Sequence, residues 1–235
     1  MSGSIRLFVS APLAEGVEVQ ATPGQAHYLG TVMRRATGAP VRLFNGADGE
    51  WQARLTVIKR DRAVLAVETP LRAQAAEPDL WLAFAVLKRD ATDLVAQKAT
   101  ELGVSALVPV ITERTNAERV NATRIIAIAT EAAEQSERLT VPRVAPLQRL
   151  PDLLVHWPAG RTLFAAIERA GAAPLRPRQG GSAAALLVGP EGGFSERELD
   201  ALRARPFVVP VSLGPRILRA ETASIVGLAL LQAGD

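Results

Sequence analysis

Two glycine-containing turns late in the chain have the residue types best suited to binding a small molecule. The first, residues 189–193 (Gly-Pro-Glu-Gly-Gly), follows the apolar run 183–188, and the second, residues 213–219, follows the apolar run 207–212. Glycine lets the backbone approach a ligand closely or adopt positive φ. Neither turn has the Gly-x-Gly-x-x-Gly spacing of a dinucleotide site or the Gly-Lys-Ser/Thr of a phosphate loop. Two such turns predict one shared ligand site, and an enzyme is the favoured class.

The side chains of these turns refine the prediction without settling it. The carboxylate of Glu191 would repel a phosphate but could accept hydrogen bonds from ribose hydroxyls or an amine. Ile217 and Leu218 could cover a flat apolar ligand while the backbone reads its edges. A tight strand-to-helix connection explains the first turn equally well. A helix N-terminus explains Glu221 but not the Arg-Ile-Leu-Arg run at 216–219.

The elements that would position these turns alternate between strand and helix from Leu80 onward. This alternation predicts an α/β domain with a mainly parallel sheet, in which ligands bind beyond the carboxyl ends of the strands. We expect strands at 80–87, 106–110, 162–166, 183–188 and 207–213, helices at 90–102, 117–138, 195–204 and 220–232, and a loop at 174–182.

The N-terminal part of the chain, 1–72, has a different pattern and predicts a small β-barrel. Short alternating or β-branched runs predict strands at 5–9, 17–19, 41–44, 51–58 and 63–68, with one helix at about 24–33 and a turn at 45–49. The Pro- and Ala-containing stretch that follows, from about residue 70, indicates a linker. The predicted domains are therefore 1–72, a linker at 73–79, and 80–235.

Composition and charge limit the possible functions. The chain has no cysteine and only two histidines, His27 and His156, so a cysteine- or histidine-based metal site is not expected. No apolar run approaches the roughly 20 residues of a membrane span, and no signal peptide is recognisable, so we expect a cytoplasmic protein without a membrane partner.

The net charge of +3 arises in residues 1–72, which contain nine basic and six acidic side chains. Arginine pairs with phosphates and stacks on bases, so this part favours RNA binding. Compositional bias explains the choice of arginine over lysine, but not the place of the excess charge.

The two turns also carry a resemblance. Residues 187–194 (Leu-Val-Gly-Pro-Glu-Gly-Gly-Phe) and 213–223 (Leu-Gly-x-Arg-Ile-Leu-Arg-x-Glu-Thr-Ala) resemble the signature of SPOUT-class methyltransferases, and more narrowly of the bacterial 16S rRNA uridine-N3 methyltransferase family (RsmE). Residues 97–104, 109–114 and 131–136 are similar to the middle blocks of that family, and 43–46 to an N-terminal one. Asn45 stands where the family pattern has Asp, and Glu137 where it has Gly.

The resemblance implies a PUA-like barrel followed by a SPOUT domain with a trefoil knot, a homodimer, S-adenosylmethionine as cofactor, and 16S rRNA of the small ribosomal subunit as partner. By the same resemblance, the cofactor would contact Val188, Gly189, Pro190, Glu191, Gly192, Gly193, Leu213, Gly214, Ile217 and Leu218. Arg219, Glu221 and Arg138 are the candidate catalytic residues, and His27, Arg34, Arg35, Arg114, Gln135 and Ser136 are the candidate RNA-binding residues.

Two other functions stay open from the sequence. A methyltransferase of the same fold could modify another RNA, for example a ribose hydroxyl in tRNA. A non-enzymatic RNA-binding or ribosome assembly factor would bind RNA without a cofactor, although two complete glycine turns would then have no use.

Overall fold

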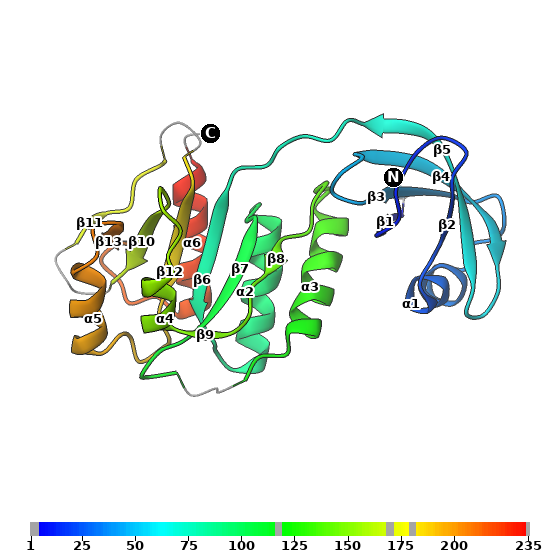
Figure 1. The fold of residues 1–235 in the computed structure, drawn as a ribbon. Helices are drawn as coiled ribbons and strands as arrows, with labels where there is room; N and C mark the ends of the chain where they lie inside the picture. Colours follow the sequence, from blue (N-terminus) through cyan, green and yellow to red (C-terminus); the bar gives the residue numbers. More distant parts are fainter. Residues whose placement is uncertain (1–4, 116–118, 168–171, 179–181, 234–235) are drawn as a thin grey trace. The chain divides into compact units, whose positions relative to one another are not determined.

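The structure is a computed structural model that describes residues 5–115, 119–167, 172–178 and 182–233 (Figure 1). The chain separates into two compact units. The N-terminal unit contains Met1–Ala76 and Ala133–Val141, and the C-terminal unit contains Glu77–Ala132 and Pro142–Asp235. A short segment from the middle of the chain therefore belongs with the N-terminal residues, a feature that local sequence patterns do not indicate.

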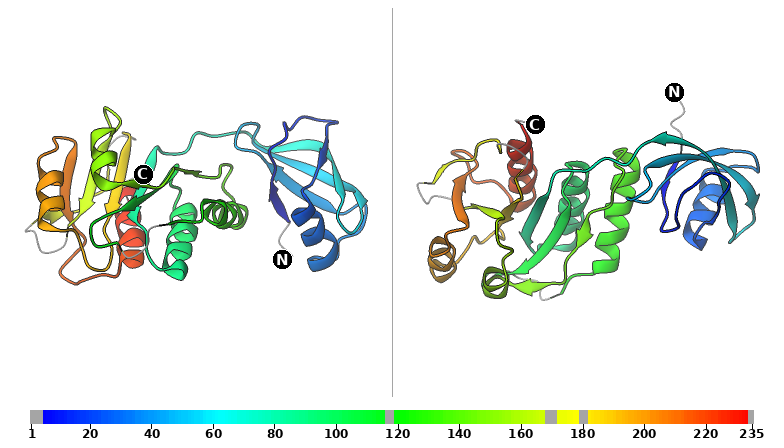
Figure 2. Two further views of the ribbon diagram at one scale, coloured as in Figure 1. Left: turned by 60° about the horizontal axis from the view of Figure 1, so that its bottom comes forward. Right: turned by 45° about the horizontal axis from the view of Figure 1, so that its top comes forward.

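The N-terminal unit is built on a curled five-stranded sheet with the order β1-β3-β4-β5-β2. Its strands are β1 (Arg6–Phe8), β2 (Glu18–Gln20), β3 (Pro40–Phe44), β4 (Glu50–Ile58) and β5 (Ala63–Arg72). Three register shifts between β4 and β5 bend the sheet, because an extra residue in one strand increases its local twist. Figure 2 shows the sheet curling over α1 (Pro23–His27). The predicted barrel is present as this half-barrel, and β5 continues to Arg72, into the stretch in which a linker was expected to begin.

The single helix predicted at 24–33 is divided in the structure. Thr22 caps α1 through a capping box with Gln25, and a π-helical turn, η1 (Tyr28–Val32), follows directly. Ala26 and Leu29 are fully buried and join the core under the sheet. The π-helix is rare in proteins and often lies near functional residues.

The C-terminal unit has an eight-stranded sheet in which every strand pairing is parallel, which confirms the predicted α/β class. Along the sheet the order is β11-β13-β10-β12-β6-β7-β8, and β9 pairs with β7. The strands are β6 (Leu80–Ala85), β7 (Ala106–Ile111), β8 (Arg143–Val144), β9 (Gln148–Arg149), β10 (Thr162–Ala166), β11 (Ala173–Pro174), β12 (Ala184–Val188) and β13 (Val208–Ser212).

Helices cover both faces of this sheet. The helices are α2 (Arg89–Glu101), α3 (Ala122–Gln135), α4 (Leu150–Val155), α5 (Glu196–Arg203) and α6 (Ala220–Gln232). Strand β12 is buried throughout, and its successive side chains point to opposite faces. Leu187 packs in a core cluster with α4 and α5, whereas Leu186 faces Gly227 of α6. In the part of the chain that the structure describes, no helix combines the length and apolar character needed to cross a membrane.

Candidate functional site

A cavity of about 460 Å³ is lined by residues at the carboxyl ends of β10, β12 and β13. Figure 1 shows where these strands lie in the C-terminal unit. Both glycine turns, the last residue of β10, Ala166, and the residue after it, Ile167, form its wall. All ten residues for which cofactor contact is predicted line this cavity: Val188, Gly189, Pro190, Glu191, Gly192, Gly193, Leu213, Gly214, Ile217 and Leu218. The structure thus brings these residues together at one place, as the position of the turns after parallel strands predicts.

The first turn is held in shape by its own contacts. A Cβ on Gly189 would lie 3.0 Å from Cε2 of Phe194, so the ring occupies the space that a side chain would need. The amide of Gly193 donates to the carbonyl of Pro190 at 2.8 Å, and Gly193 has φ +67°. Ser195 and Glu198 then form the expected capping box at the start of α5. At its three glycines the turn therefore presents backbone to the cavity.

Arg114, in the loop after β7, is attached to the same turn. Its Nη1 donates to the carbonyl of Gly192 at 2.7 Å, and Arg114 lines the cavity. The neighbouring amide, that of Glu113, donates to the buried carboxylate of Glu198 at 2.8 Å. Since Glu198 also caps α5, the loop, the turn and the helix are connected by hydrogen bonds. The RNA-binding role predicted for Arg114 is untested, but its position is at the cavity.

The second turn is more open. Gly214 has φ +118°, and its amide donates to Ser212 Oγ at 3.2 Å. Residues with a side chain strongly disfavour this backbone conformation. Ile217 is 64% exposed although it is a large aliphatic residue, so its apolar surface is available to a ligand. The wall also contains Arg216, which was not among the predicted site residues. Its position between Gly214 and Ile217 is the signal that could have identified it.

The candidate catalytic residues of α6 lie just beyond the cavity wall. Arg219 is the N-cap residue of α6, with an exposed side chain, and Glu221 lies half-buried in the first helical turn. Neither is among the residues that line the cavity, although Leu218 and Ala220 beside them are. Their catalytic roles stay predictions.

The other candidate substrate residues belong to the N-terminal unit. Gln135 ends α3 with an exposed side chain, and Ser136 follows it. Arg138 is buried, and its Nη2 donates to Thr140 Oγ1 at 3.1 Å. Glu137 has φ +59°, the left-handed conformation that favours glycine, and the family pattern has Gly at this position.

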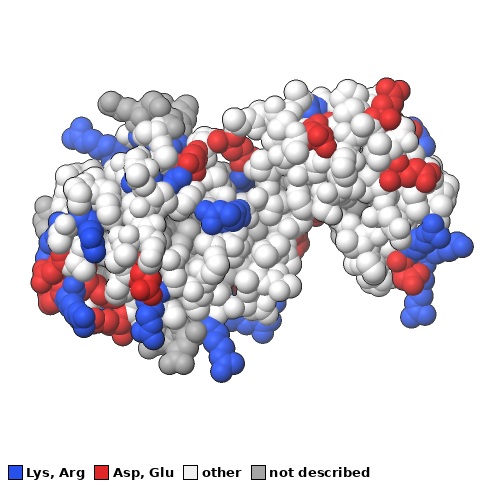
Figure 3. All heavy atoms as spheres, viewed as in Figure 1, with Lys and Arg blue, Asp and Glu red and all other residues white. Residues whose placement is uncertain are grey.

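A basic surface surrounds η1 in the N-terminal unit. His27 ends α1, while Arg34, with φ +50°, and Arg35 follow η1. The side chain of Ile58 lies 3.3 Å from the Cβ position of Gly30, which brings the β4–β5 turn, with Lys59, Arg60 and Arg62 and one acidic residue, Asp61, beside η1. In Figure 3, Lys and Arg side chains gather at the end of this unit where Figure 1 shows α1. A surface of this charge suits a phosphate backbone.

Within the described residues, no group of three or more His, Cys, Asp and Glu side chains gathers where it could hold a metal ion.

Comparison with known proteins defines the class of this fold and site. Residues 75–232 match the family model of an RNA methyltransferase domain, and residues 22–68 match that of the RNA methyltransferase PUA domain.

A sequence relative then identifies the family within this class. The chain is 34% identical to the ribosomal RNA small subunit methyltransferase E of Rickettsia conorii, over 95% of this chain and 93% of the relative. The chain therefore belongs to the ribosomal RNA small subunit methyltransferase E family.

Two solved structures extend the similarity over the whole fold. The ribosomal RNA small subunit methyltransferase E of Neisseria gonorrhoeae, bound to S-adenosyl methionine, is 32% identical with a TM-score of 0.88 over 98% of each chain. A methyltransferase of Legionella pneumophila, in complex with the same cofactor, is 28% identical with a TM-score of 0.88, over 99% of this chain and 98% of the other.

Proposed function

We propose that this chain is an S-adenosylmethionine-dependent methyltransferase that modifies N3 of a uridine in 16S rRNA of the small ribosomal subunit. The observation that carries the proposal is one cavity whose wall contains all ten predicted cofactor residues, which come from both motifs. The names of its relatives and the cofactor bound in similar structures point the same way.

The cavity fits this cofactor chemically. S-adenosylmethionine has a flat purine, ribose hydroxyls and an amino-acid end with one carboxylate and one ammonium group. The wall offers apolar surface from Leu218 and Ile217, exposed backbone groups at the glycines, and charges of both signs, from Arg114 and Arg216 and from Glu191 and Glu196. Such a mixture of apolar surface and a few polar groups is typical of cofactor sites. A Cβ on Gly193 or Gly214 would meet no protein atom within 4 Å, so open space adjoins both glycines.

When bound, S-adenosylmethionine supplies a methyl carbon on a sulfonium, whose S–C bond breaks with the electron pair remaining on sulfur. The protein must align the uracil N3 with that carbon, and alignment alone can supply about 7–11 kcal/mol of the barrier. Because N3 lies on the Watson–Crick edge, the base must be unpaired or extruded. Gln135 and Ser136 are our candidates for holding that edge.

The N3 proton must also be removed, so that the N3 electron pair can form the bond to carbon. The resulting negative charge spreads to the uracil carbonyl oxygens, where an arginine would stabilise the transition state. Arg219 is our first candidate for this role, and Arg138 and Arg114 are the next candidates. Glu221 or Glu191 would accept the proton or orient the arginine.

The basic surface of the N-terminal unit supports RNA binding. His27, Arg34 and Arg35 would contact phosphates, which position an RNA without reading its sequence.

The division into domains at 1–72 and 80–235, with a linker at 73–79, belongs to the same proposal, as do the trefoil knot, the homodimer and the cytoplasmic location. The family resemblance supports the knot and the dimer, and an rRNA substrate supports the cytoplasm.

The test is incubation of the protein with labelled S-adenosylmethionine and either assembled small subunits or naked 16S rRNA, followed by mapping of the modified nucleoside. We expect label in N3-methyluridine at one position. Label in another nucleoside or in tRNA would replace the proposed substrate. RNA binding without any cofactor binding would favour an assembly factor.

A further inference from the structure

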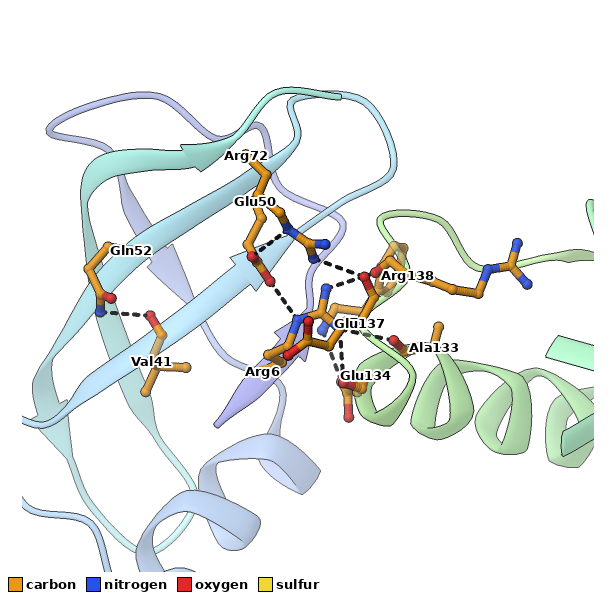
Figure 4. A network of polar contacts seen from close by, with 10 residues as sticks. Arg6, Val41, Glu50, Gln52, Arg72, Ala133, Glu134, Glu137 and Arg138 are labelled. Carbon is orange, nitrogen blue, oxygen red and sulfur yellow. Dashed lines mark hydrogen bonds and ion pairs between the residues drawn. The ribbon is translucent and has the colours of Figure 1, made fainter. Parts of the chain in front are cut away.

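The N-terminal unit contains a buried arginine, Arg6, whose position neither the cavity nor the basic surface explains. Its side chain is 4% exposed, and its Nε donates to Oε1 of Glu50, which is 1% exposed, at 2.5 Å. The other oxygen of Glu50 accepts from Nε of Arg72 at 2.8 Å. The guanidinium carries four further N–H groups. Figure 4 shows Arg6 between the Glu50 carboxylate and the last turn of α3.

These N–H groups bind the end of α3. Nη1 donates to the carbonyls of Ala133 and Glu134 at 3.0 and 2.8 Å, and Nη2 donates to the carbonyl of Arg138 at 2.8 Å. The last four carbonyls of a helix have no partner within the helix, and the helix dipole favours a cation there. Arg6 therefore caps a helix that ends far later in the chain, at Gln135.

The same segment is fixed at two further points. The amide of Phe8 donates to the carboxylate of Glu134 at 2.9 Å, and Nη2 of Arg72 donates to the carbonyl of Glu137 at 2.9 Å. The three hydrogen bonds described from Arg6 to this segment all go to backbone carbonyls. The path of residues 133–138 is thereby fixed while the side chain of Gln135 stays exposed.

We propose that Arg6 is a positioning residue for methyl transfer. It holds the backbone of residues 133–138 in the conformation in which Gln135, Ser136 and Arg138 contact the substrate base. This inference rests on the proposed function. A displacement of about 1 Å in a substrate-positioning group can cost on the order of 100-fold in rate. Lysine cannot replace Arg6, because a single ammonium lacks the planar fork that reaches a carboxylate and three carbonyls at once.

The test compares Arg6→Lys with Arg54→Lys in the full-length chain. Arg54 pairs with Glu68 on the surface of the same unit, at 2.6 Å, and serves as the matched control. Cofactor sites are titrated first with S-adenosylmethionine, and kcat per site is then measured on the RNA that the wild type methylates. We expect Arg6→Lys to lower kcat per site about 10- to 100-fold. Its affinity for RNA should change less than about 3-fold, because phosphate contacts dominate that affinity. Arg54→Lys should change neither quantity.

A purely structural role would give a different result, since unfolding of the N-terminal unit lowers RNA affinity together with kcat. Such a parallel loss would overturn the inference, and so would a wild-type kcat per site in Arg6→Lys. If Arg6→Lys does not fold, Glu50→Gln, which keeps the shape of the side chain and removes its charge, is measured in the same way and judged by the same outcomes. A wild type that transfers no methyl group to any RNA would overturn the proposed function, and this inference with it.

Discussion

Replacement of Gly193 by alanine tests the cofactor site with the smallest possible change. Gly193 has φ +67°, and an added Cβ would meet no heavy atom within 4 Å, so the cost is conformational and not steric. The left-handed conformation costs an L-residue about 1–2 kcal/mol. If the strain destabilises the turn conformation that binds the cofactor relative to other conformations of the folded protein, the binding conformation becomes about 5- to 30-fold less populated. The apparent Kd for S-adenosylmethionine should rise by the same factor.

Gly160 provides a matched control in the same unit. It has φ +79°, an added Cβ would again meet nothing within 4 Å, and Gly160 is not among the residues that line the cavity. Gly160→Ala should therefore destabilise the fold by a comparable amount, about 1–2 kcal/mol, and leave cofactor affinity unchanged. Gly214→Ala should weaken binding at least as strongly as Gly193→Ala, because its φ of +118° lies outside the region that alanine adopts.

Isothermal titration with S-adenosylmethionine measures the Kd of each variant, and thermal denaturation measures the stability of each fold. We expect Gly160→Ala to lose stability without losing affinity, and Gly193→Ala to lose affinity with no greater loss of stability than Gly160→Ala. Unchanged affinity in both Gly193→Ala and Gly214→Ala, at wild-type stoichiometry, would refute the placement of the cofactor between the two turns.

Three further predictions concern RNA binding, packing and acid stability. Arg34→Glu with Arg35→Glu should weaken RNA binding and reduce the slope of log K against log salt by about 0.7 per lost phosphate contact; an unaltered slope would move the RNA surface elsewhere. A Cβ on Gly227 would lie 2.5 Å from a methyl of buried Leu186, whereas one on Gly24 would meet nothing within 4 Å. In urea titrations, Gly227→Ala should therefore lower the free energy of unfolding by about 1–3 kcal/mol, and Gly24→Ala should raise it by about 0.5–1 kcal/mol. Burial raises the pKa of Glu50, but hydrogen bonds and charge from two arginines outweigh it, so the pKa lies below its ordinary 4.5. The stability that follows from this lowered pKa is fully present above the ordinary pKa and is lost as the pH falls through the lowered pKa. Glu50→Gln should reduce this loss when the free energy of unfolding is measured against pH in acid.

The candidate site and the sheet that carries it could be predicted from the sequence because their determinants are local. Strand β10 and helix α6 have the expected bounds, and both turns directly follow strands of the parallel sheet, β12 and β13. Once strands are parallel, their carboxyl ends share one edge, and topology alone brings residues 188–194 and 213–218 together. Of the residues missed at this site, Phe194 and Arg216 lie inside the same two motifs, whereas Ala166 and Ile167 come from the end of β10.

Short elements and helix ends were predicted less well. The strands β8 and β9 and the helix α4 are too short for a periodic pattern, and none was predicted. The helix predicted from residue 117 begins at Ala122 in the structure, where Asn121 Oδ1 accepts from the amide of Arg124 at 3.0 Å. This is a typical N-cap contact. Residues 116–118 lie outside the described part of the chain.

The end of α3 could not be predicted because distant residues determine it. A helix to residue 138 was expected, yet α3 ends at Gln135, and Arg6 donates to the carbonyls of Ala133 and Glu134 in its last turn. The backbone then turns through Glu137 at φ +59°. This conformation costs a non-glycine residue about 1–2 kcal/mol. The bond from Arg72 to the carbonyl of Glu137 is made by the backbone and depends on no particular side chain at 137. A glutamate in place of the family's glycine therefore does not abolish the turn, because contacts with the N-terminal residues impose the backbone path that glycine would merely permit.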